Sequence, residues 1–192
     1  QQGGYIFNAK AGRFENIDNK VLPPKDITCF LQSSPNSVLI GTTSGLFMYF
    51  KALKATSAVR LPVASANISC LYKDNHGNIW IGTNDCFLKF ERDNTFTVIN
   101  LPSKALVESF FMDSKKRLWI GTTDGFYSYS ESKGKPEKLI DAPEASGSLA
   151  LNNKKPIFED NTGNLWFGTF GRGIYMLPSH SGKLLNFTTT DT

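Results

Sequence analysis

The stretch DNHGNIWIGTNDC, at residues 74–86, decides the fold because the chain repeats it. Close copies are DSKKRLWIGTTDG at 113–125 and DNTGNLWFGTFGRG at 160–173, and a fainter copy is SSPNSVLIGTTSG at 33–45. The Gly-Thr pairs of the four copies are 41, 39 and 47 residues apart. A period near ~40 residues indicates a repeat protein whose unit is either a set of helices or a sheet of about four strands.

The second copy and its surroundings are typical of four short strands. In ISCLYKD, at 68–74, successive residues alternate between two faces, and IWIGT at 79–83 is an apolar run between turns. CFLKFE at 86–91 and TFTVI at 95–99 follow after brief turns rich in Asn and Asp. Such short runs are typical of strands, and no window shows the 3.6-residue period of a helix. We therefore expect an antiparallel meander of four strands in this repeat.

The same pattern in the other repeats predicts an all-β fold, a β-propeller segment of four-stranded antiparallel blades. GYIFNAKAGRFENI, at 4–17, matches GIYMLPSHSGKLLNF at 173–187, which is the outer half of a blade. The chain is thus interpreted as one propeller fragment of about four and a half blades, forming a partial ring. The predicted units of residues 1–192 are a half blade at 4–20 and blades at about 27–62, 68–101, 107–141 and 154–188.

The two chain ends do not complement each other as the ends of a closed ring would. The N-terminal piece supplies outer strands, but the last blade already has its own. An open arc leaves sheet faces and edges unprotected. We therefore expect either the remaining blades of a longer parent chain or a second copy of this chain to cover them.

The residues that recur in every copy have packing interpretations. A large flat side chain on the second strand can fill the wedge between neighbouring blades, and the glycine that follows permits close backbone approach or a bend. The Trp position is held by Trp80, Trp119 and Trp166, with Leu39 in the first copy, and the Gly position by Gly41, Gly82, Gly121 and Gly168. Gly45 and Gly125 suit a hairpin that needs a positive φ, so Cys86, which replaces them, should change its turn or strain it.

Composition limits the other classes of function. The hydrophobic share of 40% and the charged share of 20% are those of a globular protein. The net charge of +4 comes from Lys and Arg in short clusters, such as Lys115, Lys116 and Arg117, each in a predicted turn. No concentrated basic face is visible, so this segment is not expected to bind nucleic acid. The three cysteines, Cys29, Cys70 and Cys86, show no metal-ligand spacing and are expected to be buried thiols, with a disulfide left open.

The sequence carries no motif of a known catalytic centre. The nucleophile elbow, the phosphate-binding loop, HExxH and the dinucleotide fingerprint are absent from the sequence. His76 and His180 fall in predicted turns. We therefore predict no catalytic residue, no cofactor and no metal site in this segment.

Loops that vary within the constant frame are the candidates for ligand binding. The loops between second and third strands hold Asn, Asp, Ser and Thr, which hydrogen-bond sugar hydroxyls, and one aromatic that could stack on a sugar ring. The same residues also form ordinary turns, which leaves a purely structural role open. The candidate ligand-binding residues are Ser44, Asn84, Asp85, Thr123, Asp124, Phe170 and Arg172.

The repeats closely resemble those of the regulator propellers in bacterial hybrid two-component sensors of Bacteroides type. The resemblance rests on the pattern D-x-x-G-x-[LI]-W-[IF]-G-T-x-x-G-[LIF], which recurs in register over most of residues 4–188. The departures from it are Leu39 for Trp, Cys86 for Gly, and Ser114, Lys115 and Lys116 in place of the expected turn.

The resemblance implies a function that the residues alone do not show. It implies a periplasmic, ligand-sensing segment of an inner-membrane histidine kinase, which responds to oligosaccharides, is itself non-catalytic and acts as a homodimer in the parent protein. Two alternatives stay open. One is a propeller scaffold that binds protein, and the other is part of a secreted propeller lyase or glycosidase.

Overall fold

The fold class predicted from the repeat is confirmed. The structure, a computed structural model, describes residues 5–16, 26–64, 67–141, 157–169 and 173–188. Within these ranges the regular elements are all strands, and four four-stranded antiparallel sheets are preceded by one two-stranded hairpin. The described part of the chain contains no helix long and apolar enough to cross a membrane.

Each four-stranded sheet is a meander whose strands pair in chain order, and we call these sheets blades 1 to 4. Blade 1 consists of β3 (Ile27–Ser34), β4 (Ser37–Thr42), β5 (Gly45–Phe50) and β6 (Ala55–Val59). Blade 2 consists of β7 (Cys70–Lys73), β8 (Ile79–Gly82), β9 (Cys86–Phe90) and β10 (Phe96–Asn100). Blade 3 consists of β11 (Val107–Met112), β12 (Leu118–Thr122), β13 (Gly125–Tyr129) and β14 (Glu137–Asp141). Blade 4 consists of β15 (Ile157–Glu159), β16 (Leu165–Gly168), β17 (Ile174–Leu177) and β18 (Leu185–Phe187). The separate N-terminal hairpin consists of β1 (Tyr5–Asn8) and β2 (Arg13–Asn16).

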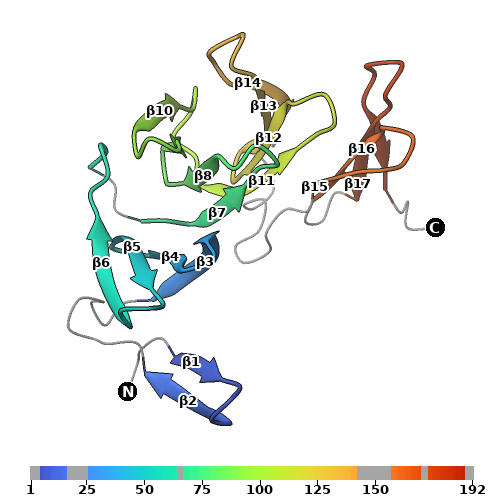
Figure 1. Cartoon of the computed structure of the whole chain (residues 1–192). Coiled ribbons are helices and arrows are strands. Elements are labelled where there is room, and N and C mark those ends of the chain that lie inside the picture. The colour runs from blue at the N-terminus through green and yellow to red at the C-terminus, as the bar shows by residue number, and fades with distance from the viewer. Residues whose placement is uncertain (1–4, 17–25, 65–66, 142–156, 170–172, 189–192) are drawn as a thin grey trace.

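The blades are arranged in an open arc around their first strands. Strand β7 contacts β3 and β11, and β11 contacts β15, so the first strand of each blade lies against that of the next. Figure 1 shows these strands on the inner side of the arc, with the other strands fanning outward. This is the arrangement of neighbouring propeller blades.

Three of the hydrophobic clusters lie between blades, and a fourth lies on blade 1 alone. One cluster joins blades 1 and 2 through Leu39 and Ile81, and another joins blades 2 and 3 through Trp80 and Ile120. A third joins blades 3 and 4 through residues such as Phe167. Because both faces of a central blade are covered, its second strand is buried along its whole length, which explains the short apolar runs of the sequence.

The Gly-Thr pair forms the joint from one blade to the next. A Cβ atom on Gly82 would lie 2.6 Å from Cys70 Sγ and 2.9 Å from Val107 Cγ1, so only glycine leaves room for the next blade. The backbone N–H of Val107 donates to the carbonyl of Thr83 at 3.0 Å. The Gly41–Thr42 pair receives the start of blade 2 in the same way, with Ile68 in place of Val107.

The threonine of the pair also closes the hairpin that follows. Its hydroxyl donates to the backbone carbonyl at the start of the third strand in all four copies. The distances are 2.9 Å for Thr42, 2.7 Å for Thr83, 2.9 Å for Thr122 and 2.8 Å for Thr169. The recurrence of Thr in the motif therefore has a hydrogen-bonding cause.

The large residues of the second strand fill the borders between blades. Trp80 lies 5.9 Å from the Tyr129 ring of blade 3, and Trp119 lies 5.3 Å from the Phe167 ring of blade 4. Leu39 is fully buried in the cluster between blades 1 and 2. Trp166, in blade 4, is half-buried and stacks on Phe187 of its own blade.

The hairpin at Cys86 differs from its counterparts in backbone, as the sequence predicts. Gly45 and Gly125 have φ angles of 149° and 144°, whereas Cys86 is not among the residues with positive φ. Instead Cys86 directs its thiol inward, 3.2 Å from the Thr83 hydroxyl. All three cysteines are buried and form no disulfide, as expected of thiols in strands.

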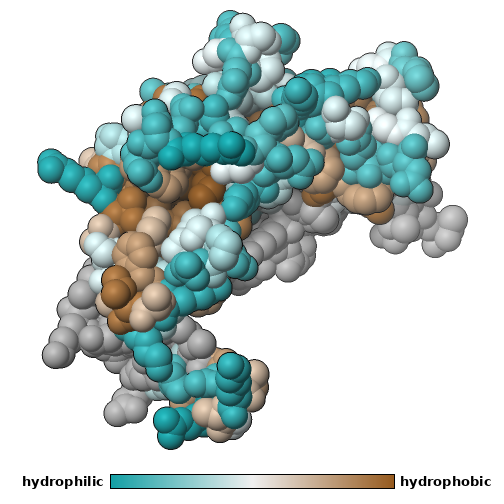
Figure 2. Space-filling model, viewed as in Figure 1, coloured by the Kyte–Doolittle hydropathy of each residue, from teal (hydrophilic) through white to brown (hydrophobic). Residues whose placement is uncertain are grey.

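The outward faces of the first and last blades carry exposed apolar side chains. These are Phe30 on blade 1 and Phe158, Ile174, Leu185 and Phe187 on blade 4. Figure 2 shows that in this view hydrophobic surface gathers over blade 1 and its border with blade 2, while most of the remaining surface is hydrophilic. The open faces of the arc thus keep the apolar character of the blade borders.

We expect Gly82→Ala to destabilise the fold by about 1–3 kcal/mol, the usual cost of overpacking a filled core. The added methyl group would collide with Cys70 Sγ and Val107 Cγ1. Urea denaturation of the variant measures the loss, and Cys70→Ala in the same chain should restore part of it. Ser57→Ala, at an exposed strand position, is the matched control. If the Gly82→Ala protein were as stable as the control, the joint between blades would not require glycine at this position.

Candidate functional site

The meander places two different sets of loops on two faces of the arc. The loops after the Gly-Thr pairs and the loops that join blades lie on one face, which we call the GT face. The turns that begin with Asp74, Asp113 and Asp160 lie at the other ends of the same strands, on what we call the Asp face. The candidate residues that the structure describes, Ser44, Asn84, Asp85, Thr123 and Asp124, belong to loops of the GT face.

On the GT face, the loop of blade 2 presents exposed polar groups. Asn84 and Asp85 are both exposed, and the Asn84 side-chain oxygen accepts a hydrogen bond from Asn67 Nδ2 at 3.0 Å. In blade 1, the backbone N–H of Ser44 donates to the Thr42 hydroxyl at 3.1 Å, which holds the tight turn. Asp85 is therefore the candidate carboxylate of this face that remains open to solvent.

Asp124 occupies the equivalent position in blade 3 but is engaged within the protein. Its carboxylate accepts hydrogen bonds from the Thr122 hydroxyl at 2.6 Å and the Tyr127 hydroxyl at 2.9 Å, and also from Ser103. Lys138 lies 3.4 Å away. Burial raises the pKa of Asp124, but the hydrogen bonds that it accepts lower it more, so the pKa lies below its ordinary value.

The candidate loops of blades 2 and 3 are thus not equivalent. Asp124 holds the loop between blades 2 and 3 to its own hairpin, and Thr123 does the same by accepting the Leu106 backbone N–H at 3.1 Å. Phe170 and Arg172 lie outside the described residues. The predicted set therefore divides into solvent-facing groups in blade 2 and structural groups in blade 3.

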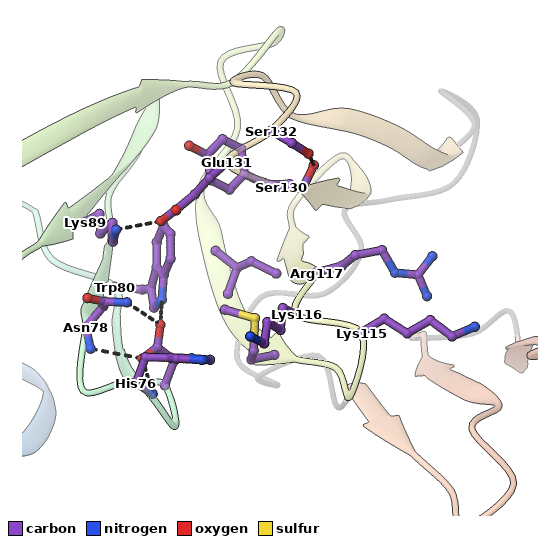
Figure 3. A pocket seen from close by; sticks show the side chains of 14 residues that line it. His76, Asn78, Trp80, Lys89, Lys115, Lys116, Arg117, Ser130, Glu131 and Ser132 are labelled. Atoms are coloured by element: carbon purple, nitrogen blue, oxygen red, sulfur yellow. Dashed lines mark hydrogen bonds and ion pairs between the residues drawn. The ribbon is translucent and has the colours of Figure 1, made fainter.

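The Asp face carries a pocket that the sequence did not predict. The cavity, of about 610 Å³, lies at the border of blades 2 and 3 and is within the usual size range of small-molecule sites. Its floor and walls include Trp80, Met112 and Leu118, and its rim includes Asn78 and Ser132. Figure 3 shows that side chains reach it from the Asp74 turn and β9 on one side and from blade 3 on the other.

The Asp74 turn holds one wall of this pocket rigidly. One carboxylate oxygen of Asp74 accepts the backbone N–H groups of His76 and Asn78, each at 2.9 Å. The other accepts Asn78 Nδ2 and the indole N–H of Trp80, each at 3.0 Å. We call this arrangement the Asp–Trp clamp. Burial raises the pKa of Asp74, but these hydrogen bonds lower it more, so the pKa lies below its ordinary value.

The clamp recurs wherever the repeat keeps both residues. Trp119 donates to Asp113 at 2.9 Å and Trp166 donates to Asp160 at 2.8 Å. In the first copy Ser33 stands in the Asp position and Leu39 in the Trp position, and two serine hydroxyls pair there instead. The two residues are lost together because a buried indole N–H and a buried carboxylate each need a partner.

An ion pair closes the pocket at its outer side. Lys89 of blade 2 lies 2.6 Å from Glu131 of blade 3, and 3.6 Å from Glu91. The Lys89 side chain is mostly buried, which lowers its pKa, but the two carboxylates raise it more, so the pKa lies above its ordinary value. The pair joins two blades directly across the cavity.

The turn of blade 3 departs from its counterparts at the pocket rim. Lys116 adopts a φ of 62° at the position where Gly77 and Gly163 have 85° and 80°. Arg117 donates from Nε to Asp113 at 2.7 Å and its guanidinium lies 5.0 Å from the Trp119 ring. A lysine in the left-handed region costs about 1 kcal/mol relative to glycine. Ser114, Lys115 and Lys116, which depart from the repeat pattern in this turn, are the feature of the sequence that could have indicated this site.

A second cavity, of about 560 Å³, lies between the β1–β2 hairpin and blade 1, lined by apolar residues such as Phe30 and Ile40. No cluster of His, Cys, Asp and Glu that could hold a metal ion occurs in the described ranges. The pocket on the Asp face is therefore the better candidate for a polar ligand.

Two segments of the chain, residues 62–85 and 151–171, match the family model of the two component regulator propeller. The chain thus contains repeats of this family, and the resemblance drawn from the sequence pattern is confirmed. No curated protein matches the chain significantly in sequence.

Solved structures with a similar fold include two domains from B. thetaiotaomicron. One, described as the extracellular domain of the hybrid two component system BT4673, is 24% identical with a TM-score of 0.71. The other, described as that of BT3049, is 25% identical with a TM-score of 0.67. Each match includes 91% of this chain and 24% of the other protein, so the chain spans about a quarter of the length of these proteins.

A propeller enzyme also shares the fold. Virginiamycin B lyase from Staphylococcus aureus is 17% identical with a TM-score of 0.72, over 97% of this chain and 63% of the lyase. At this identity the likeness shows the fold alone. The chain is therefore a propeller segment that contains two-component regulator propeller repeats, and its fold also occurs in an enzyme.

We expect the Asp–Trp clamp to make stability depend on pH. The folded-state pKa of Asp74 lies below the unfolded value of about 3.9, so its contribution is complete above that pH and is lost as pH falls through the folded pKa. Asp74→Asn should destabilise the protein by about 1–3 kcal/mol at pH 7, because the amide cannot accept all the donors.

Urea denaturation between pH 7 and pH 2 checks this, and the difference between wild type and variant should shrink below about pH 4. Asp85→Asn makes the same change of charge at an exposed position and is the control. A difference that stays constant down to pH 2 would rule out the clamp as its source.

Proposed function

We propose that this chain, a propeller segment of the two-component regulator type, is the ligand-sensing part of a hybrid two-component signalling protein. In this proposal it works in the periplasm, as the sensor region of an inner-membrane histidine kinase. It binds oligosaccharides and is itself non-catalytic. Support comes from the family model matched by its repeats and from similar solved domains described as extracellular.

The observation that carries the ligand-binding part is the pocket on the Asp face. It combines an apolar floor of Met112 and Leu118 with a rim of hydroxyl, amide and charged groups, among them Ser130, Ser132 and Asn78. A sugar presents apolar C–H faces and many hydroxyl groups, so a concave site of this composition suits it. The exposed Asn84 and Asp85 of the GT face remain a second, smaller candidate.

The position of the pocket suits a sensor because two blades form it. A ligand that contacts both the Asp74 turn and the blade 3 hairpin favours one relative arrangement of blades 2 and 3. Such a preference shifts the population of states, provided that the ligand binds them with different affinity. In the parent protein, which we propose to be a homodimer, the shift would be passed to the kinase.

The other readings receive less support from the site. A propeller lyase or glycosidase needs an acid and a base at the ligand, but the two carboxylates that line the pocket are engaged. Asp74 is held by the clamp and Glu131 by Lys89. A protein-binding scaffold would use a broad surface, and the apolar end faces of the arc are the candidates for it.

Binding by calorimetry to a panel of neutral oligosaccharides tests the proposal. We expect at least one to bind, and Ser132→Trp to weaken that binding about tenfold or more, because the exposed hairpin position admits the larger ring but the cavity does not. Asp85→Ala tests the GT face in parallel, and Ser57→Ala is the matched control.

The outcomes separate the two faces. If only Ser132→Trp weakens oligosaccharide binding, the ligand binds in the pocket. If only Asp85→Ala weakens it, the ligand binds on the GT face. Detectable turnover of a glycan by the pure chain would contradict the non-catalytic role. Absence of binding to every saccharide tested, neutral or acidic, would contradict saccharide sensing by this segment.

A further inference from the structure

We propose that the pocket on the Asp face selects an acidic saccharide, one that bears a carboxylate or a sulfate ester, and that Lys116 binds the acidic group. The inference rests on the proposed function and adds the chemical class of the ligand. Three features of the pocket support it: the pairing of its charges, the directions of its side chains, and the backbone of its blade 3 turn.

Of the four cations that line the pocket, two are paired with carboxylates. Lys89 lies 2.6 Å from Glu131, and Arg117 lies 2.7 Å from Asp113. In the described part of the chain, no carboxylate lies within ion-pair distance of Lys115 or Lys116. The pocket is therefore lined by two lysines, Lys115 and Lys116, that no carboxylate of the described residues neutralises.

The side-chain directions single out Lys116 among the cations of this turn. Figure 3 shows Lys116 on the side of the turn that faces His76, whereas Lys115 and Arg117 extend away from the Trp80 wall. The Lys115 ammonium donates instead to the Ser179 carbonyl of blade 4 at 3.5 Å. Lys116 can thus contact a ligand in the cavity. Lys115, which carries the same charge but points elsewhere, provides a control position in the same turn.

The backbone of the turn gives a reason to connect Lys116 with function. The equivalent positions of blades 2 and 4 hold Gly77 and Gly163, which adopt a positive φ without a steric penalty. Lys116 adopts a φ of 62° although its Cβ makes that conformation unfavourable. A residue kept in an unfavourable conformation at the rim of a pocket is a reasonable indicator of a binding role.

The remaining lining fits a saccharide that carries one negative charge. The neutral groups of Asn78, Ser130 and Ser132 can donate to or accept from sugar hydroxyls. A single ammonium balances a single carboxylate or sulfate ester, and a charge-assisted hydrogen bond there is stronger than a neutral one. His76, on the opposite rim, provides a further ring N–H donor.

Calorimetry with matched probes tests the inference. The probes are galacturonic acid trisaccharide and its methyl ester, and a sulfated galactose disaccharide and its desulfated form. We expect at least one acidic probe to bind about tenfold more tightly than its neutral partner, as a hydrogen bond to a charged group allows. The preference should weaken as salt is raised, because the site is open to solvent.

Two variants assign the preference to Lys116. Lys116→Gly should abolish it while the urea midpoint stays the same or rises, because glycine relieves the backbone of the turn. The loss of binding then cannot come from unfolding. Lys115→Gln changes the neighbouring charge of the same turn and should alter the affinity less than about twofold.

The possible results distinguish the acidic preference from saccharide sensing itself. Acidic and neutral probes that bind equally, or equal losses in Lys115→Gln and Lys116→Gly, would overturn the inference and leave saccharide sensing intact. Failure of all four probes and of the neutral panel would overturn the proposed function as well. An acidic preference that disappears only in Lys116→Gly supports the inference, and the two pairs of probes distinguish carboxylate from sulfate.

Discussion

The joint between successive blades depends on the absence of a side chain at one position. A Cβ on Gly41 would lie 2.5 Å from Cys29 Sγ and 2.8 Å from Ile68, which begins the next blade. Because that space is empty, the next blade can approach until its backbone N–H reaches the carbonyl of Thr42 at 2.9 Å. The two apolar clusters that join blades 1, 2 and 3 depend on this close approach, since each consists of side chains from two neighbouring sheets.

The second strand is also fixed at its other end. There the Asp–Trp clamp satisfies the donors of a tight turn and of a buried indole with one carboxylate, as in Asp74 and Trp80. The motif from Asp to Thr is therefore a strand whose start is fixed by the Asp–Trp clamp and whose end is fixed by the Gly-Thr joint. Loops between the motifs are under weaker constraint, which explains why the copies differ most there.

The candidate site exploits that freedom at a blade border. Its Trp80 wall belongs to the constant motif, whereas Lys116, Ser130 and Ser132 belong to turns that other copies build differently. A site formed by two blades is also sensitive to their relative arrangement, which a site within one rigid sheet would not be. Specificity and signalling can therefore reside in the same few turns without disturbing the frame.

Sequence alone determined the class of fold, because a period near ~40 residues and a four-strand pattern permit few other architectures. It also located the hairpins at Gly45 and Gly125, whose φ angles are 149° and 144°, and the altered hairpin at Cys86, since glycine and its absence have direct backbone consequences. It placed the large residues of the second strand at the borders between blades, where Trp80 and Trp119 lie.

Only the tertiary structure decided which polar residues are available to a ligand. Asp85 and Asp124 are equivalent in sequence, yet Asp124 alone meets Ser103 from a blade-joining loop and Lys138 from a neighbouring strand. The pocket combines residues about one repeat apart, such as Asn78 and Lys116, and no local pattern records that they face each other. Local periodicity specifies backbone elements, but the packing of one blade on the next specifies the site.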